Sequence, residues 1–408
     1  MKIVIATAVY APMINGVAMF SHNLAAGLAV RGHDVVVLTP SQTGKSYSVI
    51  EDGVKVCFLR SVDAKVYPDQ IHEAKKSKGL FYKNGFRVSV FPRREIKKIL
   101  GDFCPDVVHV QVSDPIGLSV VSYARKHNIP VVTTEHNQPE VITEPLGVPK
   151  IVKKPIDALL SSYFANRQSK SDFVTMPTKQ AISNLLDGRN FKVPVAAVSN
   201  GVDLENFKPG KADAKVYKKY NIPSGVPTVL YVGRVDPEKN VSLVLEAFSR
   251  VLKKIPTAVF VIVGDGVGRP KLMKEAERLG VFDAVKFLGR VTGEDLYELY
   301  KVGTVFATAS EIETQGIVLI EAAATGLPLI AVDAGAVGEV CIDGVNGFLC
   351  QPKNVAEIAN AMEKILSDKK MQAEFSSASI RIAKEHDFKN TLDRFINIYR
   401  HVIEKRAS

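Results

Sequence analysis

Short apolar runs that alternate with helix-like patterns constrain the fold of this chain more than any other feature. Each run spans only a few positions between turn residues, which is typical of strands buried on both faces. Such strands, separated by helices, form a parallel sheet that is covered by helices on both sides. The first half therefore predicts an α/β, doubly wound sheet with strands at Ile3–Ala8, Val35–Thr39, Val54–Leu59, Val107–Val110, Val131–Thr134, Phe173–Met176 and Val195–Val198.

The length of 408 residues exceeds what one hydrophobic core supports and indicates two domains. The stretch Ser199–Pro209 follows the last strand of the first half and is interpreted as the crossing between the domains. A second strand and helix series begins at Pro227 with P-T-V-L-Y-V-G-R-V-D. The tail from Asp387 has apolar residues at helical spacing and predicts a final helix.

The first residues, M-K-I-V-I-A-T-A-V-Y, place a lysine before an apolar run, as a signal peptide does. The residues from Gly16 to Gly32 have a helical pattern and a second strand follows them, so a β-α-β unit explains this opening better. No apolar run approaches the ~18 residues that span a bilayer. Any membrane contact is therefore expected to be peripheral.

The stretch 306–332 holds two carboxylates at a helix entrance. We predict a strand, a loop, a helix over 317–325 and a further strand within it. Glu313 lies in the loop and Glu321 inside the helix, so the two are expected to serve different parts of one ligand. The N–H groups at the helix N-terminus favour a phosphate, and carboxylates on either side of a phosphate suit hydroxyl-rich groups. This arrangement predicts a nucleotide-sugar site.

The spacing of these residues resembles a signature of the retaining family-4 glycosyltransferases of GT-B fold, E-x7-E followed by E-A-x-A-x-G-x-P. Here the signature is formed by Glu313, Glu321, Ala322, Ala324, Gly326 and Pro328. The resemblance covers essentially the whole chain and implies two Rossmann-like, doubly wound domains that face each other across a cleft. It implies an N-terminal acceptor-binding domain over 1–200, a nucleotide-sugar-binding domain over 201–386, and a helix over 387–408 that crosses back to the first domain.

The resemblance also implies roles for residues near the predicted strand ends. The four residues implied to be catalytic are His136, Arg234, Lys239 and Glu313. The residues implied to bind the donor are Gly16, Arg290, Val291, Thr314, Gln315, Gly316 and Glu321. The family has a paired glycine near the donor diphosphate, and Asn15 replaces the first of the pair here. His109 also lies at a strand end, and the sequence leaves open whether it is structural or lines the acceptor site.

We expect the charge of the departing diphosphate to be balanced by side chains. Arg234 and Lys239 are two fixed cations that can take this charge. No D-x-D sequence occurs that would hold a bridging metal, so we expect no cofactor and no required metal. The family's front-face mechanism also needs no covalent nucleophile, because the leaving phosphate and the acceptor hydroxyl share one face of the sugar.

Basic residues gather in the first half, where residues 1–200 contain 25 Lys and Arg against 16 Asp and Glu. The range 65–101 alone holds 10 basic and 3 acidic residues, mixed with aromatic ones. This mixture predicts a surface for an anionic membrane or an acceptor, formed by Lys75, Lys76, Lys78, Phe81 and Phe86. A solvated basic flap over a soluble acceptor is the alternative. The sequence contains no motif typical of nucleic acid binding, so we expect no nucleic acid partner.

The donor-loop sequence E-I-E-T-Q-G resembles that of bacterial diacylglycerol glucosyltransferases. This implies transfer of glucose from UDP-glucose to a membrane lipid such as diacylglycerol. Three alternatives stay open: the same chemistry on a soluble sugar or small molecule, a GT-B sugar-nucleotide epimerase, and a silent nucleotide-sugar-binding subunit. No C-x-x-C spacing occurs among the four cysteines, so we expect the protein to lie in a reducing cytoplasm. The proposed lipid acceptor adds peripheral contact at the inner face of the cell membrane.

Overall fold

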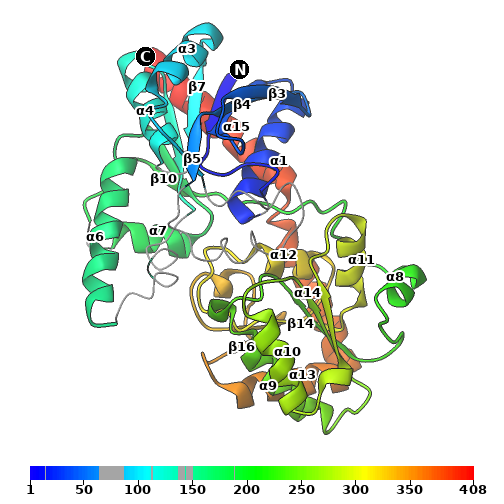
Figure 1. Ribbon diagram of the computed structural model, residues 1–408. Helices are drawn as coiled ribbons and strands as arrows, with labels where there is room; N and C mark the ends of the chain where they lie inside the picture. The colour runs from blue at the N-terminus through cyan, green and yellow to red at the C-terminus, as the bar shows by residue number, and fades with distance from the viewer. Residues whose placement is uncertain (14, 64–86, 112–113, 137–142, 144–149, 188) are drawn as a thin grey trace. The chain divides into compact units, whose positions relative to one another are not determined.

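The computed structural model divides the chain into two compact units, each built around a mainly parallel sheet (Figure 1). The first unit comprises Met1–Asn200 together with Thr391–Ser408, and the second comprises Gly201–Asn390. The structure describes residues 1–408 with the exception of 14, 64–86, 112–113, 137–142, 144–149 and 188.

The sheet of the first unit has eight strands in the order β10-β9-β8-β7-β1-β2-β4-β3. Its strands are β1 (Lys2–Ala6), β2 (Asp34–Pro40), β3 (Tyr47–Glu51), β4 (Val54–Leu59), β7 (Val107–Val110), β8 (Val131–Thr134), β9 (Phe173–Met176) and β10 (Val195–Ala197). A separate hairpin pairs β5 (Ser61–Asp63) with β6 (Arg87–Ser89). The helices are α1 (Gly16–Val30), α3 (Arg93–Phe103), α4 (Pro115–Lys126), α6 (Lys150–Gln168), α7 (Lys179–Leu186) and α15 (Phe388–Ala407). Every strand predicted for the first half is present.

The strands predicted for the first half all pair in parallel, but the edge strand β3, which was not predicted, runs antiparallel to β4 with Glu51 opposite Val54. Asp52 and Gly53 form the turn between them, with φ of 49° and 75°. Asp-Gly is a preferred pair for such a two-residue hairpin, because both positions need positive φ. This local signal is independent of the strand and helix alternation that predicted the rest of the sheet.

The second unit has a six-stranded parallel sheet in the order β13-β12-β11-β14-β15-β16. Its strands are β11 (Thr228–Val232), β12 (Val259–Val263), β13 (Val285–Gly289), β14 (Val305–Ala307), β15 (Leu329–Val332) and β16 (Gly347–Cys350). Its helices are α8 (Ala214–Lys219), α9 (Val241–Leu252), α10 (Arg269–Arg278), α11 (Glu294–Val302), α12 (Ile317–Ala324), α13 (Val355–Ser367) and α14 (Lys369–Lys384). Tyr231 joins α9 and α13 in one core, and Leu230 joins α11 and α12 in the other. Helices therefore cover both faces of the sheet, as alternating buried side chains require.

The helix α15 begins in the second unit, and its residues from Thr391 onward belong to the first. The chain therefore re-enters the first unit inside this helix, at Thr391, slightly later than the predicted boundary at residue 387. Phe395 and Tyr399 are fully buried, and the ring of Phe395 lies 5.9 Å from that of Phe20 in α1. The last helix is thus part of the core of the first unit.

Each sheet reverses its strand order at its first strand. β1 lies between β2 and β7, and β11 lies between β12 and β14. In doubly wound sheets, ligands bind beyond the carboxyl ends of the strands at such a switch point. The loops that follow these strands are therefore where candidate site residues are sought.

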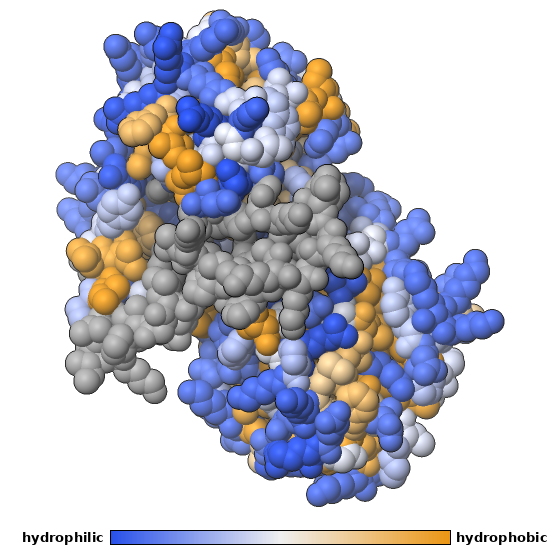
Figure 2. All heavy atoms as spheres, in the orientation of Figure 1, coloured by the Kyte–Doolittle hydropathy of each residue, from blue (hydrophilic) through white to orange (hydrophobic). Residues whose placement is uncertain are grey.

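Among the described residues, no helix combines the length and apolar character needed to cross a membrane. On the face shown in Figure 2, the apolar side chains of the described residues form small patches between hydrophilic ones. The described part of this face therefore offers no broad apolar band.

Candidate active site

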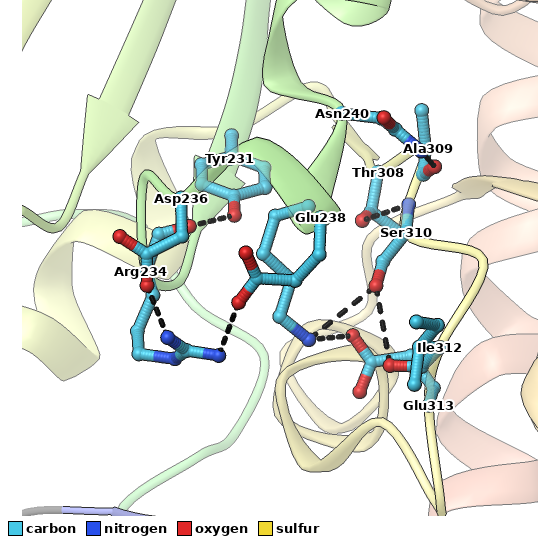
Figure 3. A network of polar contacts seen from close by, with 11 residues as sticks. Tyr231, Arg234, Asp236, Glu238, Asn240, Thr308, Ala309, Ser310, Ile312 and Glu313 are labelled. Carbon is cyan, nitrogen blue, oxygen red and sulfur yellow. Dashed lines mark hydrogen bonds and ion pairs between the residues drawn. The ribbon is translucent and has the colours of Figure 1, made fainter. Parts of the chain in front are cut away.

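The loops after the adjacent strands β11 and β14 bring a cation and a carboxylate into contact in the second unit (Figure 3). Lys239 Nζ donates to Glu313 Oε1 at 2.7 Å and to Ser310 Oγ at 3.3 Å. The side chains of Lys239 and Glu313 are each 17% exposed. Water screens their attraction less than it screens that of a surface pair. Two residues implied to be catalytic are therefore in direct contact at the switch point of this sheet.

Arg234 lies in the same loop as Lys239, but its guanidinium binds other carboxylates (Figure 3). It donates to Asp236 and, at 2.7 Å, to Glu238 Oε1. The Asp236 side chain is buried, whereas that of Arg234 is 55% exposed. The hydroxyl of Tyr231 donates to the carbonyl oxygen of Arg234 at 2.6 Å and holds the backbone in place. The guanidinium is thus held by two carboxylates and is accessible to an anion from solvent.

The loop that carries Arg234 packs closely on the glycine-rich loop after β12. Val235 N donates to Asp265 O at 3.0 Å, and Gly268 N donates to Val235 O at 2.8 Å. A Cβ at Gly264 would lie 1.8 Å from Gly233 O, so only glycine permits this approach. The G-D-G-V-G sequence therefore supports the Arg234 loop through its backbone.

The loop that carries Glu313 ends at Gly316, which caps α12 with φ of 72°. A Cβ at Gly316 would lie 2.9 Å from Leu319 Cδ1, so a larger residue would strain this helix entrance. Gln315 is buried and Thr314 is partly exposed immediately before it. Three of the residues implied to bind the donor thus lie together where helix N–H groups favour an anion.

Glu321 lies inside α12 and is bonded to the neighbouring helix α11. The hydroxyl of Tyr300 donates to Glu321 Oε2 at 2.5 Å. Burial raises the pKa of Glu321 to about 7, and the bond from Tyr300 acts in the opposite direction. Two more residues implied to bind the donor follow β13: Arg290 is exposed and Val291 is half-buried.

Gly16 is the first residue of α1 in the first unit and is exposed. Asn15, which replaces the first glycine of the family pair, is the N-cap of this helix. Its side chain accepts from Ala18 N at 2.9 Å. Asparagine is among the best N-cap residues, so the replacement has a structural reason.

His136 follows β8 and belongs to a buried polar cluster of the first unit. Its Nε2 is bonded to Gln111 Oε1 at 2.7 Å, and its ring packs edge-on against Phe20 with centroids 5.1 Å apart. Burial lowers the pKa of His136 to about 3. The imidazole is therefore neutral at physiological pH, so it can bond a sugar hydroxyl but adds no charge to a phosphate site.

His109 supports the same cluster from inside the core. Its ring nitrogens are bonded to Tyr399 Oη and Thr134 Oγ1, each at 2.6 Å. The ring is fully buried, and burial lowers its pKa to about 3. Of the two alternatives that the sequence leaves open, these contacts favour the structural one, because they join α15 to the ends of β7 and β8.

The residues predicted for a membrane or acceptor surface lie outside the described residues: Lys75, Lys76, Lys78, Phe81 and Phe86. The described end of the same basic range begins at β6 and continues into α3. Phe91 is 91% exposed there with φ of 52°, a left-handed conformation that is uncommon for a large side chain. Four exposed cations follow it on α3: Arg93, Arg94, Lys97 and Lys98.

The contacting residues that were not predicted include Gln111, Tyr300 and Glu238. Gln111 stands two positions after His109, so strand alternation could have placed both on one side. Glu238 directly precedes Lys239 in a predicted loop, where acidic residues are common. Tyr300 is 21 residues from Glu321, and their contact depends on the packing of α11 against α12, for which the sequence has no local signal.

Comparison with known families matches both halves of the chain. Residues 14–206 match Glycosyltransferase Family 4, and residues 213–381 match Glycosyl transferases group 1. The chain therefore belongs to the GT-B glycosyltransferases that combine these two domains. This confirms the family that the sequence signature indicated.

Curated relatives include two alpha-monoglucosyldiacylglycerol synthases. That of Streptococcus pneumoniae is 29% identical over 335 residues, which are 81% of this chain and 71% of the relative. That of Acholeplasma laidlawii is 27% identical over 85% of this chain and 84% of the relative. A glycogen synthase of Mycobacterium tuberculosis is 26% identical over 98% and 94%. The names of these relatives refer to different products.

Solved structures confirm the GT-B fold, with its two Rossmann-like domains. Sucrose-phosphate synthase from Thermosynechococcus elongatus has a TM-score of 0.77 at 19% identity and covers 99% of this chain and 100% of its own. HepE from Anabaena, solved in complex with UDP and glucose, has a TM-score of 0.74 at 17% identity over 98% of this chain and 100% of its own.

Proposed function

We propose that this protein is a retaining hexosyltransferase that moves glucose from UDP-glucose to a membrane lipid such as diacylglycerol. Family membership supports glycosyl transfer, and the two glucosyldiacylglycerol-forming relatives favour the lipid acceptor. The observation that carries the proposal is the contact of Lys239 with Glu313 at the switch point of the second sheet. It joins a cation for the phosphate to a carboxylate for the sugar.

The donor diphosphate is bound by Arg234 and Lys239, together with the N–H groups at the entrance of α12. When it binds, the lysine exchanges Glu313 for a phosphate oxygen. Glu313 then accepts a hydrogen bond from a hexose hydroxyl, and this bond strengthens as positive charge develops on the sugar ring. Glu321, Arg290 and Val291 contact the nucleoside in this proposal.

The reaction breaks the bond from the anomeric carbon to the phosphate oxygen and forms one to the acceptor oxygen on the same face. The acceptor hydroxyl passes its proton to the leaving phosphate. Because the new bond forms on the face that the phosphate leaves, the anomeric configuration is retained. Arg234 and Lys239 stabilise the negative charge that collects on the diphosphate. His136 binds a sugar hydroxyl as a neutral imidazole and holds the hexose in place.

The experiment that tests this chemistry is a screen of nucleotide sugars against lipid and soluble acceptors, with mass analysis of the products. We expect a hexose added to the acceptor, released UDP, and an anomeric configuration that matches the donor when the product is read by NMR. An epimerised nucleotide sugar formed from the donor alone would establish the epimerase instead. Inversion of configuration would rule out the front-face mechanism.

The lipid acceptor has its own test. Exposed cations on α3 beside Phe91 continue the basic range 65–101, and each cation near an anionic membrane adds about 1 kcal/mol. We expect sedimentation with phosphatidylglycerol vesicles but not with neutral ones. Neutralising Lys75, Lys76 and Lys78 should weaken it.

The matched control for vesicle binding neutralises three exposed lysines of the second unit, Lys211, Lys215 and Lys218, which should leave sedimentation unchanged. Equal loss in both variants would indicate unspecific charge attraction. Activity restricted to water-soluble acceptors would leave the same glycosyltransferase chemistry without the lipid.

A further inference from the structure

The carboxylate of Glu321 accepts a hydrogen bond from Tyr300, a residue that lies outside the family signature. Tyr300 donates its hydroxyl to Glu321 Oε2 at 2.5 Å. Glu321 is on α12, and Tyr300 is near the end of α11. This bond therefore joins two helices at the side chain that is proposed to bind the nucleoside.

Packing gives Tyr300 little freedom to point elsewhere. Its side chain is fully buried, and its ring lies edge-on to Phe207 at 5.4 Å and stacks near Phe306 at 6.4 Å between centroids. Ring pairs at these separations fix the direction of a side chain. The hydroxyl is therefore aimed at Glu321 before any ligand arrives.

We propose that Tyr300 is a positioning residue that orients the Glu321 carboxylate to accept the ribose hydroxyls of the donor nucleotide. The inference rests on the proposed nucleotide-binding role of Glu321. A carboxylate has about four sites for hydrogen-bond donors, and Tyr300 occupies one of them. The remaining sites can then accept two vicinal hydroxyls, as a ribose presents them.

Tyr300 also favours the charged, acceptor form of this carboxylate. Burial favours the protonated acid, whereas the phenol bond favours the charged carboxylate. Among the described residues, the ionisable groups that face it from α11 are Tyr300 and Tyr297, and the Tyr231 phenol of β11 adjoins Tyr300. These groups are neutral at physiological pH, so the phenol bond is the interaction that stabilises the charge.

The experiment measures UDP affinity by calorimetric titration from about pH 6 to 9 in the wild type and in three variants of the full chain. Tyr300→Phe removes the donor and keeps the ring. Glu321→Gln removes the charge and reports how far titration of UDP itself contributes. Tyr217→Phe is the matched control, because Tyr217 packs in the same core of the second unit.

We expect Tyr300→Phe to lower UDP affinity by roughly 10-fold near pH 7, as loss of one bond to a charged group implies. The pH below which affinity falls should move upward in Tyr300→Phe, because the acid loses the bond that favoured its ionisation. Glu321→Gln should lower the affinity for UDP and abolish the midpoint of this pH dependence. Tyr217→Phe should match the wild type.

The outcomes separate the two claims. If Glu321→Gln leaves UDP affinity unchanged, the nucleotide-binding role of Glu321 fails and the inference fails with it. If Glu321→Gln weakens UDP but Tyr300→Phe shifts neither the affinity nor the midpoint, only the positioning role is overturned. A lowered melting temperature with an unmoved midpoint would likewise indicate a purely structural phenol.

Discussion

The two units place different chemistry beyond the strand ends of similar sheets. In the first unit, Gln111 after β7 bonds the neutral ring of His136 after β8, and the adjacent carboxylate of Glu135 is buried and accepts from Gln168. In the second, the loops after β11 and β14 carry charges, with Lys239 on Glu313 and Arg234 between two carboxylates. The strand ends of the first unit thus carry a neutral ring, whereas those at the switch point of the second unit carry cations that suit an anion.

Pairing explains the difference. His136 and His109 are buried with neutral partners, so burial lowers their pKa values to about 3 and they stay uncharged. Lys239 is largely, though less completely, withdrawn from water, and a carboxylate lies 2.7 Å from it. A phosphate that replaces Glu313 would keep that lysine paired, so donor binding would exchange one anion for another and leave no buried charge alone.

The largest effect is expected from removal of the cations. Arg234→Ala and Lys239→Ala should each raise the barrier to sugar transfer by about 2 to 4 kcal/mol, because the diphosphate then leaves with less compensation of its charge. Steady-state kinetics of both variants would show this in kcat/KM. Arg250→Ala is the control, since Arg250 is a similarly exposed, ion-paired arginine on α9.

The comparison predicts that removal of the neutral ring, in His136→Ala, costs less than removal of either cation. A loss in His136→Ala that equals or exceeds both would mean that charge does not separate the two units.

The next effect concerns Glu313. Glu313→Gln should lower kcat by roughly 100-fold, because a carboxylate bond to the sugar strengthens in the transition state. UDP affinity should change little, whereas Glu321→Gln should weaken UDP. Titration of both variants with UDP checks the assignment. If affinity falls for Glu313→Gln and holds for Glu321→Gln, the roles of the two carboxylates are reversed.

Local patterns predicted the scaffold and the positions of charged loop residues, but not their partners. The run before Gly233 and the signature at Glu313 were sufficient to place Lys239 and Glu313 beyond strand ends. Their contact depends on β11 and β14 being neighbours, which is a property of strand order across 74 residues. The Tyr300 bond depends on helix packing for the same reason. The hairpin at Asp52 shows the reverse case. Its Asp-Gly turn is a local signal, but the interpretation of the first half relied on the alternation of strands and helices and did not use it.

A smaller effect distinguishes the two units by how the stability of each depends on pH. His109 has a folded pKa of about 3 against 6.5 for the free group, so its contribution to stability is present above about pH 6.5 and is lost as pH falls. Glu321 has a folded pKa of about 7 against 4.5, so its ionisation costs stability as pH rises from 4.5 to 7.

Denaturant unfolding at an acidic and an alkaline pH would show the two signs. Relative to the wild type, His109→Gln should be less destabilised at acidic pH than at alkaline pH. Glu321→Gln should gain stability on the alkaline side, by on the order of 1 kcal/mol. Shifts of the same sign in both variants would contradict the contrast between the units.

The smallest effect is expected from metal chelation. Arg234 and Lys239 supply two positive charges where the diphosphate is proposed to bind, and the entrance of α12 adds the partial charge of its N–H groups. A chelator should therefore change the initial rate of sugar transfer by no more than about twofold, because these groups compensate the leaving charge without a bridging ion. The measurement compares rates in EDTA and in added magnesium, with the Lys239→Ala variant as the matched case. Magnesium that partly restores Lys239→Ala but leaves the wild type unaffected would sharpen the assignment of charge to this lysine. A wild-type rate that depends strictly on a divalent metal would show that the cations of the second unit are not enough.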